Sequence, residues 1–468
     1  MKMRRQLRKK YIAILVLSAT FLLCTYKPLQ DTLKGWTSPA VKLLLSKHQK
    51  HHPAYMDKLL NASCPHYKSS LGRDSSFVTV KQTKTLLISA YLEHRTKEKE
   101  VRVISVVLRS QSVAYICILC CQGLRYISEG VSHINSDHFG FPYGTADIMC
   151  PLPLGCQTPS HIAVITDVPK DEDKLEFLEI QNQNPKSDSF PYNFTVCLST
   201  MFDFTNVLQL VQSLEMFQLL GVNKVVVYKT SCSAETQLIL DYYTHKGLLE
   251  VIPWSLSRFF KVSRGWLPEH GPGELHYFGQ MPALTDCLYR YMYRSKYVAM
   301  QDIDELILPQ SVNSWLELLP LLEKKYGLDK CYKFENNVFP NNVPLPPLAP
   351  QTLPPQGCWK NISGVNILAH LHQEPIGFWT WYQNFKIIVS PRAVFTPTVH
   401  GVLSSERGCT WVDRNIARLY HTRAQKQTRL TPDQLIYDGR LLSYSAPLVP
   451  AVNTVLKESG LLPKNSIC

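Results

Sequence analysis

The chain has 468 residues, enough for two or three domains, and its 45% hydrophobic and 19% charged residues are globular proportions that exclude a disordered protein. The net charge is +13, but residues 1–60 alone carry twelve Lys or Arg against two Asp or Glu. The remainder is nearly neutral, so we expect no nucleic-acid partner, because a nucleic-acid surface needs clustered basic residues.

The N-terminus has the layout of a signal anchor. Six basic residues within residues 1–10 precede an uncharged apolar run at residues 11–26. No small-residue cleavage pattern follows, so we predict an uncleaved transmembrane helix at 11–26; a cleaved secretory signal is the alternative. Residues 1–10 would then be a cytosolic tail and the rest luminal, as in a single-pass type II protein. Residues 27–60 are basic and His-rich and are predicted to form a stem.

Cysteines and glycosylation sequons also indicate the lumen. Of 14 cysteines, Cys24 lies in the predicted anchor and the other thirteen can pair in an oxidising compartment, leaving at least one unpaired. The C-x-x-C within residues 117–121 has no second C-x-x-C to complete a zinc site, so a structural role is expected. Acceptor sequons occur at Asn61, Asn193 and Asn361.

The residue pattern of 61–190 predicts a small β-rich luminal domain. Apolar, β-branched runs recur along this segment and predict antiparallel strands. No catalytic constellation is visible among them, and the charge-rich stretch at residues 170–188 is a candidate linker. The runs lie at residues 85–91, 101–108, 113–121 and 162–165.

After residue 191 strands alternate with helices, which predicts a largely parallel sheet covered by helices. The helix expected from Phe204 onward should end at Gly221, because glycine adopts the left-handed conformation that closes helices. We assign residues 191–445 to this domain and 446–468 to a C-terminal tail. The expected strands are residues 194–199, 224–228, 248–252 and 297–300.

The strand at residues 297–300 ends in acidic residues. Asp302 and Asp304 are two positions apart, so in an extended chain both carboxylates face one side. Repulsion between them is unfavourable unless a cation lies between them. Two hard oxygen ligands at a strand end suit Mn²⁺ or Mg²⁺ bound to a diphosphate, whereas the alternative is a solvated turn.

Several separated motifs, in order, resemble glycosyltransferase family 92 over roughly residues 190–440. The resemblance implies an α/β fold with a GT-A-type, Rossmann-like catalytic domain behind the β-rich domain and transmembrane helix. It also implies an inverting, metal-dependent transfer of galactose from UDP-galactose to a glycan acceptor, with β-1,4 linkage, at the Golgi membrane. The motifs are residues 276–280, 283–290, 295–297, 302–305 and 386–391.

The resemblance also implies roles for individual residues. Asp302 and Asp304 match the family's D-x-D, with Asp304 the stronger candidate for the metal and Asp302 shared with the ribose. Asp286, on the preceding helix, is a candidate donor-binding carboxylate or a plain surface charge. A histidine commonly completes such metal sites, and both His421 and His400 qualify, with a slight preference for His421.

The sequence does not choose between two candidates for the general base of the transfer. An inverting transfer needs one group that accepts the acceptor hydroxyl's proton, and Glu335 and Glu374 are both candidates. Trp379, Trp381 and Tyr382 could stack on sugar faces. The alternative to an enzyme is a non-catalytic Golgi membrane glycoprotein or lectin-like protein with the same fold.

Overall fold

The structure is a computed structural model that describes Cys64 and residues 77–167, 175–185, 189–343, 345, 357–377 and 383–465. The described residues all belong to one compact unit. The predicted anchor at 11–26, the stem, Asn61 and the aromatic residues at 379–382 all lie outside the described residues.

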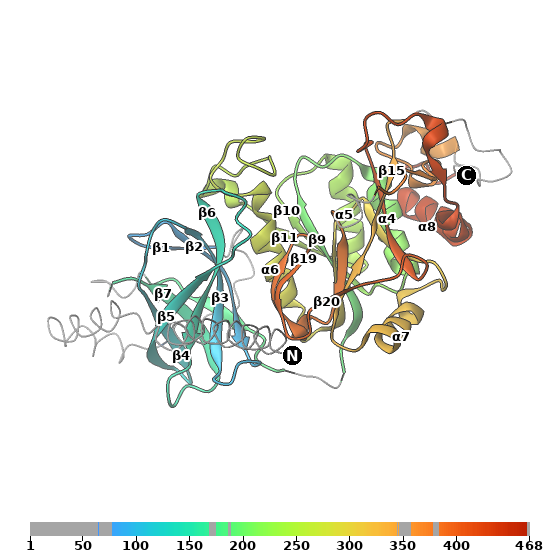
Figure 1. The fold of residues 1–468 in the computed structure, drawn as a ribbon. Coiled ribbons are helices and arrows are strands. Elements are labelled where there is room, and N and C mark those ends of the chain that lie inside the picture. Colours follow the sequence, from blue (N-terminus) through green and yellow to red (C-terminus); the bar gives the residue numbers. More distant parts are fainter. Residues whose placement is uncertain are drawn as a thin grey trace, which may run out of the picture. The chain divides into compact units, whose positions relative to one another are not determined.

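The first part of the described chain is a closed β-barrel (Figure 1). Seven strands follow the order β2-β3-β6-β5-β4-β7-β8, and β8 pairs back onto β2 in parallel, while β1 adds to β2. The strands are β1 (Val78–Val80), β2 (Thr85–Glu93), β3 (Glu100–Leu108), β4 (Tyr115–Cys121), β5 (Leu124–Ile134), β6 (Tyr143–Pro151), β7 (Pro159–Ile165) and β8 (Leu178–Gln181).

Disulfides link strands and loops of the barrel. Cys117 on β4 pairs with Cys150 on β6, and its neighbours pair as Cys64–Cys120 and Cys121–Cys156. Cys117, Cys121, Cys150 and Cys156 lie in the apolar core of the barrel. The structural role expected for the C-x-x-C segment is therefore confirmed.

A seven-stranded sheet follows, in the order β11-β10-β9-β12-β17-β14-β20. Its first four members are parallel neighbours joined through helices, which confirms the predicted β-α-β alternation. The elements are β9 (Tyr192–Met201), α4 (Val207–Leu219), β10 (Lys224–Lys229), α5 (Ala234–His245), β11 (Leu249–Pro253), α6 (Gln280–Arg290), β12 (Ser295–Gln301), β14 (Cys331–Phe334), β17 (Lys386–Val389) and β20 (Cys409–Trp411).

Smaller sheets and two more helices complete the unit. A three-stranded sheet, β13-β21-β15, starts where β12 ends, and β18 and β19 form a hairpin. The elements are β13 (Glu305–Pro309), α7 (Trp315–Tyr326), β15 (Asn336–Pro340), β16 (His372–Gln373), β18 (Val394–Thr398), β19 (Gly401–Ser405), β21 (Ala417–Arg423), β22 (Ile436–Tyr437) and α8 (Ser445–Glu458). Short 3-10 helices lie at Leu256–Arg258, Tyr277–Gly279, Gly357–Asn361, Ile367–Ala369, Pro391–Ala393, Pro432–Gln434 and Arg440–Tyr444.

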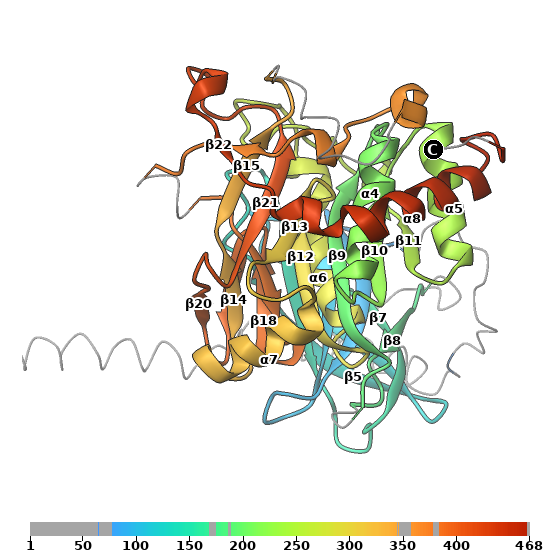
Figure 2. The same cartoon turned by 90° about the vertical axis from the view of Figure 1, so that its right-hand side faces the viewer.

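Helix α4 is buried on most of its surface, because it lies between the sheet and α8. Figure 2 shows α8 crossing in front of α4, and the two helices are in contact. Gly221 follows α4 with φ +94°, a conformation that glycine adopts without a steric penalty, as predicted. Residues 446–468, expected to be a tail, therefore include most of helix α8, which packs on α4.

The fold class expected from the sequence is wrong. We expected a Rossmann-like α/β domain of GT-A type, preceded by a small β-rich domain and a transmembrane helix. The described residues instead form a sheet-rich fold, with a closed seven-strand barrel and a mixed sheet in which β17 runs antiparallel to β12. Local patterns predicted strands but not their pairing partners. Within the described part of the chain, no helix is both long and apolar enough to cross a membrane.

Candidate active site

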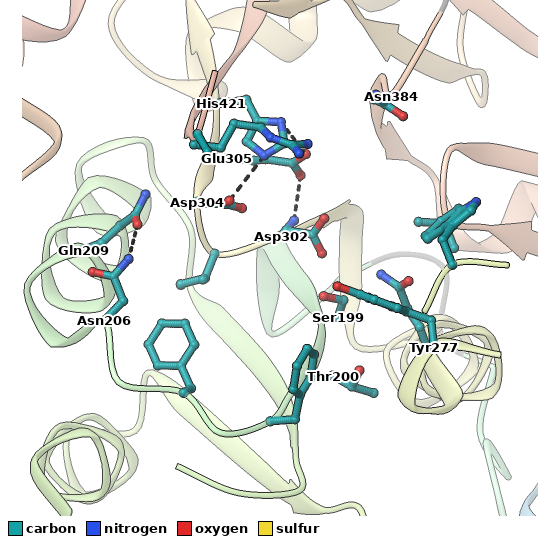
Figure 3. A pocket seen from close by; sticks show the side chains of 18 of the residues that line it. Ser199, Thr200, Asn206, Gln209, Tyr277, Asp302, Asp304, Glu305, Asn384 and His421 are labelled. Atoms are coloured by element: carbon teal, nitrogen blue, oxygen red, sulfur yellow. Dashed lines mark hydrogen bonds and ion pairs between the residues drawn. The ribbon is translucent and has the colours of Figure 1, made fainter. Parts of the chain in front are cut away.

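A cavity of about 710 Å³ opens beyond the carboxyl ends of β9 and β12. Its walls come from the start of α4, the segment before α6, the β18–β19 hairpin and the end of β21. Figure 3 shows His421, Glu305, Asp304 and Asp302 together, with Tyr277 facing them across the cavity. Cavities at this edge of a sheet with parallel strands are common ligand sites.

The acidic residues lie on a tight turn rather than on an extended strand. The turn joins β12 to β13, and the backbone N–H of Glu305 donates to the carbonyl of Asp302 at 3.2 Å. The side chain of Gln301 donates to the carbonyl of Glu305 at 2.7 Å. Asp302, Asp304 and Glu305 all line the cavity, although the assumption of an extended chain does not hold.

His421 meets the turn because β13 and β21 pair in antiparallel register, with Glu305 opposite His421. Nε2 of His421 lies 3.2 Å from Oδ2 of Asp304, and Nδ1 lies 3.4 Å from Oε1 of Glu305. The structure therefore brings His421, one of the two candidate histidines, next to Asp304. His400 also lines the cavity, but its Nδ1 contacts the carbonyl of Phe385 at 3.0 Å.

The positive charge of Lys386 balances the negative charge of the acidic turn. Its buried ammonium lies 2.8 Å from Oδ2 of Asp302 and 3.3 Å from Oε2 of Glu305. Burial alone would raise the pKa of the Asp302 carboxyl, but Lys386 lowers it to about 2. For Glu305 burial prevails over Lys386 and raises the pKa to about 7. Burial would lower the pKa of His421, but Glu305 and Asp304 raise it.

The donor atoms at this site fit part of the coordination shell of Mn²⁺ or Mg²⁺. With metal–ligand bonds of about 2.1 Å, adjacent ligands of an octahedral ion are about 3 Å apart, close to the 3.2 Å between Asp304 and His421. The described residues hold no group of three or more His, Cys, Asp or Glu side chains placed to bind a metal. Substrate phosphates and water commonly supply the other ligands of such ions.

Asp286 lies outside the cavity. It is buried and accepts hydrogen bonds from Tyr91 at 2.6 Å, Tyr228 at 2.5 Å and Arg290 at 3.0 Å. Burial would raise the pKa of Asp286, but Arg290 and the hydrogen bonds lower it. Tyr91 belongs to β2 of the barrel, so Asp286 joins the barrel to α6 and β10.

The two candidate bases, Glu335 and Glu374, also lie away from the cavity lining. Glu335 is buried beside Arg414, with 3.6 Å between Oε1 and Nε. Glu374 is buried and accepts from the backbone N–H groups of Lys426 and Gln427, at 2.6 Å and 3.2 Å. The sequon residues Asn193 and Asn361 are exposed.

Several lining residues were not identified from sequence. Arg423 follows His421 by two positions on β21 and is exposed at the cavity. Tyr277 faces the acidic turn with a positive φ of 28°, and Asp302 and Asp304 add to burial in raising its pKa. Backbone strain of this kind gathers at functional sites. Lys386 and Tyr277 both stand in motifs quoted above, but no local pattern places Tyr277 at a cavity or Lys386 beside the acidic turn.

Comparisons with known proteins agree on one family. The sequence profile of glycosyltransferase family 92 matches residues 192–453. The glycosyltransferase family 92 protein F13G3.3 of Caenorhabditis elegans is 28% identical over 27% of this chain and 25% of its own length. The beta-1,4-galactosyltransferase galt-1 of the same organism is 25% identical over 26% of this chain and 27% of its own length. The chain thus spans only about a quarter of these relatives' lengths. Because the family profile covers more than half of the sequence, the chain belongs to glycosyltransferase family 92.

Proposed function

We propose that this protein transfers galactose from UDP-galactose to a glycan acceptor, with inversion and β-1,4 linkage, using Mn²⁺ or Mg²⁺. Family membership supports a glycosyltransferase, and the similarity to a beta-1,4-galactosyltransferase supports the donor. The main support for the proposal is that Asp304 and His421 are in contact at the edge of a cavity large enough for a nucleotide sugar.

In the proposed transfer, individual residues of the chain would have separate roles. Asp304 and His421 would hold the metal, and a bound metal would supply Lewis-acid stabilisation of the departing nucleoside diphosphate. Lys386 keeps Asp302 ionised at the cavity, where this carboxylate could bind a ribose hydroxyl or the metal. Arg423 adds a positive charge at the rim beside His421, which favours an anionic ligand.

We also propose that the protein acts at the Golgi membrane with its catalytic part in the lumen. Five disulfides among the described residues favour an oxidising compartment. The exposed sequon residues Asn193 and Asn361 agree with a luminal location. Immunofluorescence of the tagged full-length chain beside a Golgi marker tests this, and a purely cytosolic signal would contradict it.

The function is tested by screening UDP-sugars with purified full-length protein and Mn²⁺, followed by an acceptor glycan array. We expect transfer from UDP-galactose and a loss of more than about 100-fold in Asp304→Ala. Full activity in that variant would remove Asp304 from the site. A non-catalytic, lectin-like protein would instead bind glycans but not UDP, so titration with UDP and Mn²⁺ separates the two.

A further inference from the structure

Glu305 is the one acidic side chain of the turn that is almost wholly buried. Its side chain is 1% exposed, against 31% for both Asp302 and Asp304. A carboxylate so enclosed has little access to substrate, and burying it is unfavourable unless neighbouring groups compensate. Its position therefore needs an explanation other than direct ligand binding.

The Glu305 carboxylate lies close to three other groups of the site: the Asp302 backbone, Lys386 and His421. Oε2 accepts from the backbone N–H of Asp302 at 2.7 Å and lies 3.3 Å from Nζ of Lys386. Oε1 lies 3.4 Å from Nδ1 of His421. Because Glu305 and His421 are direct cross-strand partners, the pairing of β13 with β21 itself sets this last distance.

The orientation of His421 depends on what its second nitrogen faces. A histidine that binds a metal through Nε2 is neutral and carries its proton on Nδ1, which then needs an acceptor. Nδ1 of His421 is buried and has no hydrogen-bond partner in this structure. Oε1 of Glu305 is at ion-pair distance, so a small rotation of either side chain completes the hydrogen bond.

We propose that Glu305 is the positioning residue of the metal site: it holds His421 with Nε2 toward Asp304 and ties this histidine to the Asp302 backbone and Lys386. The inference rests on the proposed function, because it concerns the same metal. A competing explanation is that Glu305 only balances the charge of Lys386. That explanation predicts a change in stability without a change in metal affinity.

The test is Mn²⁺ binding by purified full-length protein, measured by electron paramagnetic resonance of the free ion, with and without UDP. Glu305→Gln keeps the shape of the side chain and removes its charge. We expect its Mn²⁺ affinity to fall by roughly 10–100-fold, as for other outer-shell partners of metal ligands. Glu305→Asp should recover part of the loss. The matched control is Glu179→Gln, an exposed carboxylate on β8, which should bind like wild type.

The outcomes separate this inference from the function. Wild-type affinity in folded Glu305→Gln, together with loss of binding in Asp304→Ala, overturns the inference and leaves the metal site intact. No transfer from any UDP-sugar, together with the expected binding pattern, overturns the function and supports the inference. Absence of Mn²⁺ binding in wild type overturns both the inference and the metal dependence.

If Glu305→Gln does not fold, a second measurement on the wild-type protein tests the proposal. In wild-type protein with ¹⁵N-labelled histidine and Mg²⁺, the ring nitrogens of His421 report which one carries the proton. A proton on Nδ1 with the metal on Nε2 supports the proposal. The reverse arrangement overturns it, because Glu305 could not then accept from His421.

Discussion

Oδ2 of Asp304 lies 3.2 Å from Nε2 of His421, although 117 residues separate them in the sequence. The pair forms because β13, which begins after the acidic turn, lies antiparallel to β21. A backbone hydrogen bond from Thr422 to the carbonyl of Asp304, at 3.0 Å, holds the two segments together. Paired strands therefore place His421 next to the turn that carries Asp304, and strands position side chains more exactly than loops do.

The two candidate histidines should respond differently to substitution. His421→Ala removes the group in contact with Asp304 and should weaken Mn²⁺ binding by more than the roughly 10–100-fold typical of an outer-shell partner. His400→Ala should weaken it by less than about 10-fold, since His400 contacts the Phe385 carbonyl. Titration of Mn²⁺ in the presence of UDP measures both. A larger loss in His400→Ala would reverse the assignment.

Lys386 should be essential for stability. Its side chain is 3% exposed and compensates both Asp302 and the buried Glu305. Lys386→Met leaves Glu305 buried without a cation, so we expect the free energy of unfolding to fall by about 3–5 kcal/mol in urea titrations.

Lys325→Met is the matched control for Lys386→Met. Lys325 and Asp413 form an exposed ion pair at 3.7 Å, with side chains 51% and 43% exposed. Such pairs contribute only about 0–1 kcal/mol, because solvent screens them. Equal losses in the two lysine variants would contradict the account of the buried pair.

Asp286 should matter for stability rather than for donor binding. Asp286→Asn weakens the hydrogen bonds to Tyr91, Tyr228 and Arg290, and it should lower the free energy of unfolding by about 1–3 kcal/mol. The KM for UDP-galactose, measured where the variant is folded, should stay at the wild-type value. A raised KM without loss of stability would return Asp286 to the donor site.

His276 should make the protein sensitive to acid. Burial lowers the pKa of His276 to about 4, and neither ring nitrogen has a hydrogen-bond partner. The unfolded chain, with a histidine pKa of about 6.5, binds the proton more readily. Stability is therefore full above about pH 6.5 and is lost as the pH falls toward about 4, by about 3 kcal/mol in total.

The measurement for His276 is urea unfolding at several pH values. His276→Phe keeps an aromatic ring against Phe139 and Trp266 and should reduce the loss of stability between pH 6.5 and 4.5. His270→Phe changes an exposed histidine of the same loop and serves as the control. An unchanged pH dependence in His276→Phe would exclude this residue as the cause.

The acidic residues at the cavity lie close together in the sequence, so a local pattern reveals them as a group. Asp302 and Asp304 are neighbours at a strand end, and the resemblance offers both His421 and His400 as a further ligand. Lys386 was quoted in a motif but received no role, because its contact with Asp302 depends on β17 pairing with β12. For Asp286 the sequence leaves a donor-binding carboxylate and a surface charge open, because a helix pattern does not show which face meets the barrel.

The sequence by itself determined the local elements: the β-branched runs, the β-α-β alternation after residue 191 and the glycine that ends α4. These follow from the periodicity of apolar residues and from backbone sterics, which act between near neighbours. Only the tertiary structure decided the ring of seven strands, the antiparallel β17 and the meeting of Glu305 with His421 and Lys386. Those relationships depend on which distant strands pair, and many pairings satisfy the same local pattern.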